Sequence, residues 1–226
     1  RIGGFSSTRR REVGIVAFTA IFPVACQVAA EGPALDGCRH FLFIFPAIAV
    51  LAGIGLSASV GALARFHRST MVVWLAVVAT CYTWTAGKLY HLHPHEYLYY
   101  NQLVGGLEGA SRRFVTDYWV NSMPEAVEEL HDFLDRTEPA TAQTKPYRVA
   151  VCGERVAYEE YARSNLQWIR MPDWRYADFY IAPTHMNCDR NLDGQVIARV
   201  ERMGVTIGVV KDRRAIRAQG YKPPAE

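Results

Sequence analysis

The chain has 226 residues, of which 50% are hydrophobic and 21% are charged, and its net charge is +3. These averages, with a mean hydropathy of -0.04, are ordinary for a globular protein of one or two folded units and exclude little by themselves. The distribution along the chain is more informative. Between Val13 and Trp84 the charged residues are confined to two short connections, whereas after Lys88 they are spread throughout.

Three apolar runs dominate residues 1–90 and predict three transmembrane helices, at about residues 13–30, 41–64 and 69–87. Each is close to or above the length that crosses a bilayer. Pro23 lies inside the first run, where membrane helices tolerate proline because neighbouring groups satisfy the freed carbonyl. The sequence therefore predicts a membrane α-helical bundle; the alternative is three buried helices of a soluble protein.

Basic residues predict the orientation of these helices. The arginines at positions 9–11 and the Arg65/Arg68 connection fall on one side if each run crosses once, and the positive-inside rule places that side in the cytoplasm. Residues 31–40 and everything after Lys88 then lie outside. Because the chain begins with Arg1 and has no signal-peptide pattern, we expect a C-terminal piece of a longer protein; a processed or truncated small membrane protein is the alternative.

Residues 91–122, here called the collar, combine aromatic residues, histidines and glycines, a mixture that suits a membrane–water boundary. His91, His93, His95 and Glu96 invite comparison with a metal site. Pro94 interrupts their spacing and no second ligand pair is evident elsewhere, so a structural boundary segment is favoured over a metal centre. No metal ion and no cofactor is predicted.

Residues 123–226 predict a small extracytoplasmic α/β domain with a parallel or mixed sheet. Ser122 is the expected cap of a helix over residues 123–137, whose apolar positions share one face. The elements expected after it are strands at 147–153, 176–184 and 205–212, and helices at 156–166 and 194–204.

Cys152 ends the first of these strands, and Cys188 follows the second. In adjacent parallel strands both would lie at the same edge of the sheet, so they are a candidate disulfide in an oxidising compartment. Two unpaired thiols are the equal alternative. The small basic group Arg213, Arg214 and Arg217 lacks surrounding aromatic platforms, so no nucleic-acid partner is expected.

Few side chains are candidates for chemistry. Asp117 and Glu108 are carboxylates that could serve as acid or base, although isolated acids on a polar surface are usually just solvated. Arg39 and His40 precede an apolar helix at the expected outer surface. An arginine there could bind a phosphate through paired N–H donors, or could simply anchor the interface.

Two stretches resemble the C-terminal part of bacterial multi-spanning glycosyltransferases of the GT-C type, the relatives of protein O-mannosyltransferases and aminoarabinose transferases (glycosyltransferase family 39 and its neighbours). The resemblance covers roughly the first half of the chain, with His95 and Tyr100 departing from the pattern. The first stretch matches at Asp36, Gly37, Arg39 and His40; the second matches at His93, Pro94, Tyr97, Tyr99, Asn101, Leu103, Val104, Gly105 and Gly106, followed by Asp117, Tyr118 and Trp119.

The resemblance implies transfer of a sugar from a polyprenyl-phosphate donor to an acceptor on the outer face of the bacterial inner membrane. It implies an inverting displacement with a carboxylate base from a first outer loop, which these residues do not include, so we expect this chain to be inactive alone. Arg39 and His40 would lie near the donor phosphate, and the other motif residues would be structural. The alternative is a non-catalytic, membrane-anchored protein whose outer domain binds a partner or glycan; a transporter is a weaker alternative.

Overall fold

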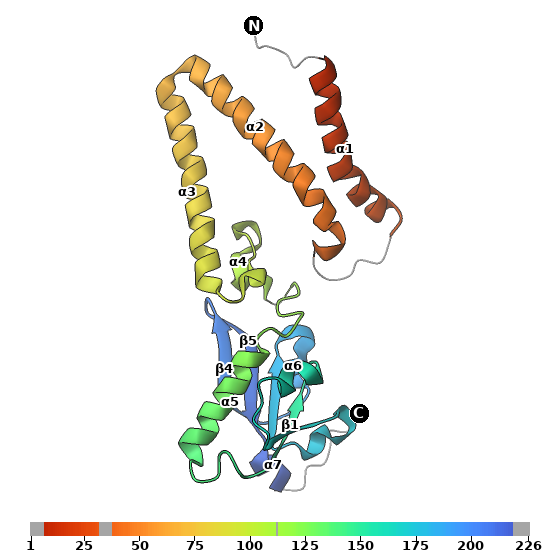
Figure 1. The fold of residues 1–226 in the computed structure, drawn as a ribbon, viewed down its shortest axis with the longest axis vertical. Coiled ribbons are helices and arrows are strands. Elements are labelled where there is room, and N and C mark those ends of the chain that lie inside the picture. Colours follow the sequence, from red (N-terminus) through yellow and green to blue (C-terminus); the bar gives the residue numbers. More distant parts are fainter. Residues whose placement is uncertain (1–6, 32–37, 112, 219–226) are drawn as a thin grey trace. The chain divides into compact units, whose positions relative to one another are not determined.

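The computed structural model describes residues 7–31, 38–111 and 113–218, and its chain divides into two compact units, Arg1–Ala86 and Gly87–Glu226 (Figure 1). Within the described residues, three helices are long and apolar enough to cross a membrane. They are α1 (Ser7–Ala29), α2 (Phe45–Phe66) and α3 (Arg68–Leu92), and they agree with the three predicted runs. A 3-10 helix, η1 (Cys38–Ile44), precedes α2.

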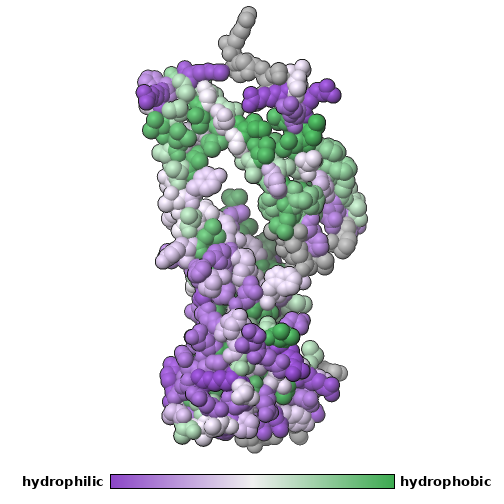
Figure 2. Space-filling view, in the orientation of Figure 1, coloured by the Kyte–Doolittle hydropathy of each residue, from purple (hydrophilic) through white to green (hydrophobic). Residues whose placement is uncertain are grey.

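The first unit exposes its apolar side chains, whereas the surface of the second is mostly hydrophilic (Figure 2). Phe18, Ile21 and Phe43 are among the large apolar residues that are at least half exposed. Such an exterior suits a hydrocarbon solvent. Trp74 donates a hydrogen bond from Nε1 to Oγ of Ser59 at 3.0 Å, which joins α3 to α2.

The second unit contains a mixed five-stranded sheet of order β2-β1-β3-β5-β4. Strands β1 (Tyr147–Val151), β2 (Leu166–Ile169) and β3 (Phe179–Pro183) are parallel, whereas β5 (Val205–Asp212) is antiparallel to β3 and to β4 (Gln195–Arg202). Its helices are α4 (Gly106–Ala110), α5 (Met123–Thr137), α6 (Arg155–Glu159) and α7 (Arg214–Ala218). Short 3-10 helices lie at Glu96–Leu98, Gln102–Val104, Met171–Tyr176 and His185–Arg190.

Alternate residues of the sheet build two cores. On one face Phe179 and Ile181 of β3 pack with Val127 and Leu130 of α5. On the other face Tyr180 and Ala182 belong to a smaller cluster covered by the segment between β3 and β4. Because side chains alternate along a strand, a central strand buried on both faces reads as one continuous apolar run.

Two predicted helices of this unit are wrong. Residues 194–204 form β4 and its turn into β5, with Met203 and Gly204 at φ 50° and 80°. Gly204 is therefore part of a hairpin turn that requires positive φ, rather than the end of a helix. The helix expected at 156–166 is reduced to α6, after which the chain enters β2, a strand that its sequence did not predict.

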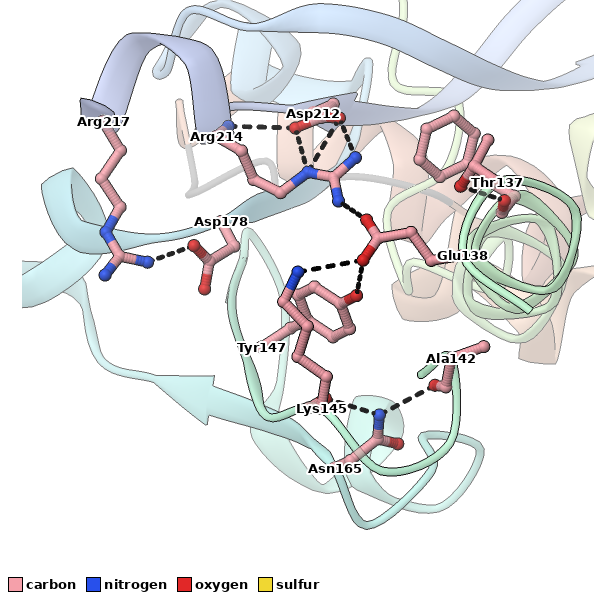
Figure 3. A network of polar contacts seen from close by, with 11 residues as sticks. Thr137, Glu138, Ala142, Lys145, Tyr147, Asn165, Asp178, Asp212, Arg214 and Arg217 are labelled. Atoms are coloured by element: carbon pink, nitrogen blue, oxygen red, sulfur yellow. Dashed lines mark hydrogen bonds and ion pairs between the residues drawn. The ribbon is translucent and has the colours of Figure 1, made fainter. Parts of the chain in front are cut away.

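A polar network ties the end of α5 to the sheet and to α7 (Figure 3). Glu138, which follows α5, accepts hydrogen bonds from Lys145 Nζ at 2.9 Å and from the Tyr147 hydroxyl at 2.7 Å, and it pairs with Arg214. The Tyr147 hydroxyl, Lys145 and Arg214 lower the pKa of Glu138 from its ordinary value of 4.5 to about 2.

This network predicts a pH-dependent stability. Because the pKa of Glu138 is lower in the folded than in the unfolded chain, its contribution is complete above about pH 5 and is lost as the pH falls towards about 2. The melting-temperature difference between wild type and Glu138→Gln should therefore shrink over that interval. The matched control, Glu128→Gln on the exposed side of α5, should show a constant difference.

Candidate functional site

The collar forms part of the second unit. Leu92, the last residue of α3, and Leu98 are 1% and 0% exposed and belong to the same core as Met123 of α5. The last residue of α3 is therefore part of the core of the second unit. The motif residues of the collar are arranged between this helix end and the sheet.

Asp117 is the centre of the collar. Its carboxylate is fully buried and accepts hydrogen bonds from the Tyr97 hydroxyl at 2.5 Å, the Asn121 amide at 2.8 Å, and the Ser122 hydroxyl and amide at 2.5 and 3.1 Å. A carboxylate away from water is tolerated only with such donors. The prediction that Asp117 is an isolated, solvated acid is wrong, while Glu108 is exposed as that prediction expected.

One further prediction about this region is wrong, and one contact was not foreseen. Ser122 does not cap α5 with its side chain, because its hydroxyl donates to Asp117. Tyr97 has a raised pKa, first because its hydroxyl end is partly removed from water and then because it donates to the Asp117 carboxylate, so its hydroxyl remains protonated. Sequence reasoning missed this pairing since positions 97 and 117 are distant along the chain.

A second polar chain links the collar to β4. His95, 2% exposed, places Nε2 3.5 Å from Oε2 of Glu125, and Arg202 donates to both oxygens of Glu125 at 3.0 and 2.5 Å. Burial alone would raise the pKa of Glu125, but the Arg202 guanidinium outweighs it and the pKa is lowered. At position 95, where the GT-C pattern has an aromatic residue, this chain has a buried histidine whose ring lies within hydrogen-bonding distance of Glu125.

The motif glycines shape the loop after Tyr100. Asn101 accepts a hydrogen bond from the Leu103 amide at 3.0 Å, and Gly105 and Gly106 have φ of 82° and 64°. A Cβ on Gly109 would lie 2.1 Å from the carbonyl oxygen of Val104, so only glycine fits there. Gly109 was not among the predicted motif residues, although its closeness to Gly105 and Gly106 in the sequence could have indicated a tight turn.

The remaining motif residues and the possible metal ligands of the collar do not gather at one site. The peptide bond between His93 and Pro94 is cis, and Nδ1 of His93 lies 2.6 Å from Glu96. Within the described ranges, no group of three or more His, Cys, Asp or Glu side chains is placed to hold a metal ion. Asp36 and the side chain of Arg39 lie outside the described residues, whereas His40 is exposed in η1. Phosphate binding by Arg39 and His40 stays a prediction.

A second group of residues gathers at the carboxyl ends of β1 and β3. The sheet order places β2 and β3 on opposite sides of β1, which makes this edge the switch point where open α/β sheets commonly bind ligands. Tyr118 contacts both Trp119 and His185, with ring centroids 5.0 and 5.6 Å apart. Trp119 is 64% exposed, and His185 was not a predicted site residue.

The loops at this edge are fixed. Cys152 and Cys188 form a disulfide with sulfur atoms 2.02 Å apart, at the shared edge that parallel strands predicted. Val120, Met186 and Asn187 have φ between 52° and 57°, a region costly for residues other than glycine. Strained loops next to exposed aromatic rings mark this edge, called here the Tyr118–Trp119–His185 cluster, as the candidate binding surface.

Removing the charge of Asp117 tests the centre of the collar. Asp117→Asn replaces one accepting oxygen with an amide that cannot accept from Ser122 or Tyr97, so we expect a loss of about 2–3 kcal/mol in unfolding free energy. Glu108→Gln, at an exposed position of α4, should leave the stability unchanged within about 0.5 kcal/mol. Chemical unfolding in detergent would measure both; equal effects would contradict a structural role for Asp117.

Gly109→Ala tests the loop before α4. The added methyl group must displace the Val104 carbonyl, and we expect a destabilisation of about 1–3 kcal/mol. Gly87→Ala is the control because a Cβ there meets nothing within 4 Å in α3, where alanine favours the helix. A thermal melt in which both variants match the wild type would rule out the close approach.

Comparison with protein-family models, curated proteins and solved structures found no match to this chain. A functional assignment therefore depends on the sequence motifs and on the geometry of the two units.

Proposed function

We propose that this chain is the C-terminal part of an integral membrane glycosyltransferase that uses a polyprenyl-phosphate-linked sugar. The observation that carries the proposal is the collar motif. Tyr97, Asn101, Gly105 and Asp117, which carry the resemblance to GT-C enzymes, each have a specific structural role at the end of a candidate span. Because each of these residues has a structural role, the resemblance to GT-C enzymes is better explained by a similar local structure than by a chance match of residues.

In this proposal the protein resides in the bacterial inner membrane, with the second unit on the outer side. The basic residues Arg9, Arg65 and Arg68 support that orientation. Arg39 and His40 then lie at the outer surface, where the Arg39 guanidinium binds the donor phosphate through paired hydrogen bonds.

The proposed reaction is a displacement at the sugar. An acceptor hydroxyl attacks the anomeric carbon, the bond to the phosphate oxygen breaks, and polyprenyl phosphate leaves with the electron pair.

The base that takes the acceptor's proton is expected from a loop outside these 226 residues. Asp117 is unsuited to that task because it is fully buried and already accepts four hydrogen bonds. A general base must reach the proton that it removes. The second unit therefore acts in positioning rather than in proton transfer.

The alternative function is a non-catalytic, membrane-anchored protein whose outer domain binds a partner or a glycan. The Tyr118–Trp119–His185 cluster favours it, because an exposed indole beside a histidine offers both an apolar face and hydrogen-bonding groups. This cluster needs no catalytic loop to bind a ligand. The two functions therefore differ in whether polyprenyl phosphate is released.

Release of polyprenyl phosphate from a labelled donor, measured in membranes containing the full-length protein, tests the proposal. Arg39→Ala should lower the rate about 10–100-fold, the equivalent of one lost charge-assisted hydrogen-bonding group. Arg65→Ala, in the connection on the opposite side, is the control and should keep the wild-type rate. Unchanged kinetics for Arg39→Ala would remove the phosphate role, and absence of release by the wild type would favour the anchored binding protein.

A further inference from the structure

Exposed apolar side chains of the second unit are concentrated close to α3. Among its described residues, five large exposed hydrophobic side chains lie in residues 87–122 and six in the much longer range 123–218. Those in the first range are Tyr90, Tyr97, Leu103, Phe114 and Trp119. Leu103 is 95% exposed, and it is the gathering of such residues in one segment, rather than Leu103 by itself, that is informative.

Leu103 and Phe114 are held outward by the structure beneath them. Tyr100 joins their two loops, because its hydroxyl donates to the Val115 carbonyl at 2.5 Å and its ring stacks on Phe114 with centroids 5.8 Å apart. Asn101 fixes the Leu103 amide at 3.0 Å. These contacts fix the backbone of both loops and one face of the Phe114 ring.

A positive charge lies next to Phe114 in the sequence. Arg113 is exposed and directly precedes Phe114. A cationic side chain beside apolar ones is the composition of surfaces that lie in the headgroup region of anionic bilayers. The apolar groups enter the boundary of the acyl chains while the guanidinium meets the lipid phosphate.

We infer that Leu103, Arg113 and Phe114 form a lipid-binding surface that inserts into the headgroup region of an anionic bilayer. The occupant follows from the chain itself: α3 is long and apolar enough to span a membrane, and it ends at Leu92, inside the core of the second unit. Ten residues separate that helix end from Leu103, and 21 separate it from Phe114. The inference depends on membrane residence and holds whether or not the chain belongs to a glycosyltransferase.

Fluorescence quenching by lipids with brominated acyl chains tests this surface. The whole chain is placed in nanodiscs of phosphatidylglycerol and phosphatidylcholine, and a tryptophan is introduced by Leu103→Trp. The matched control is Met171→Trp, because Met171 is also an exposed apolar residue of the second unit, 70% exposed. The fluorescence of each introduced tryptophan is obtained by subtracting the fluorescence of the wild-type chain in the same nanodiscs.

We expect the tryptophan at 103 to be quenched at least about twofold more than that at 171, since insertion brings it within ~5–10 Å of the acyl boundary. Arg113→Ala should reduce the quenching at position 103, and the reduction should be larger at a higher phosphatidylglycerol fraction. Arg148→Ala, which removes an exposed arginine elsewhere on the second unit, should leave the quenching unchanged at every fraction. Equal quenching at both positions overturns the inference. Protection of position 103 from aqueous acrylamide without quenching by bromolipid also overturns it, because a protein surface would then cover Leu103.

Discussion

The buried carboxylate of Asp117 is the constraint on which the collar depends. A charge removed from water must be met by donors, and here four of them come from Tyr97, Asn121 and Ser122. Three of those donors lie within five residues of Asp117, so satisfying the charge also closes the turn that leads into α5. The fourth, the Tyr97 hydroxyl, brings in the segment that follows α3.

This arrangement sets the start of α5 and what α5 can reach. Ser122, which would otherwise cap the helix with its hydroxyl, is committed to Asp117. Glu125 stands in the first turn, where a negative charge is favourable, and from there it binds Arg202 at the end of β4. Contacts therefore run from the segment after α3, through Asp117 and the first turn of α5, to the edge strand β4. Val120, forced to a φ of 56°, bears part of the cost of the turn.

Periodicity and length were sufficient for the elements that dominate the fold. The three apolar helices, the amphipathic α5 and the strands β1, β3 and β5 all follow from them, and a sheet of parallel or mixed type was predicted. Both errors come from the edge strands. In β4, apolar residues on consecutive positions obscure the alternation, because register shifts interrupt its pairing with β5. In β2, four residues are too few to show a period.

The candidate site was less predictable because its contacts join distant positions. Nothing local distinguishes Asp117, which is buried, from Glu108, which is solvated. His185 meets Tyr118 only because two loops share one edge of the sheet. For Cys152 and Cys188 the sequence placed both residues at one edge of the sheet but left a disulfide and two free thiols equally open; β1 and β3 are parallel neighbours, and the two sulfurs are bonded.

The carboxylates of the second unit limit what it can contribute to chemistry. Asp117 is enclosed by donors, Glu125 and Asp212 are paired with arginines, and Glu138 binds a lysine, a tyrosine and an arginine. Each would have to give up its partners before it could accept a proton from a substrate, at the cost of leaving those partners uncompensated. These four carboxylates therefore hold the collar, α5 and the sheet together and are poorly suited to accept a proton.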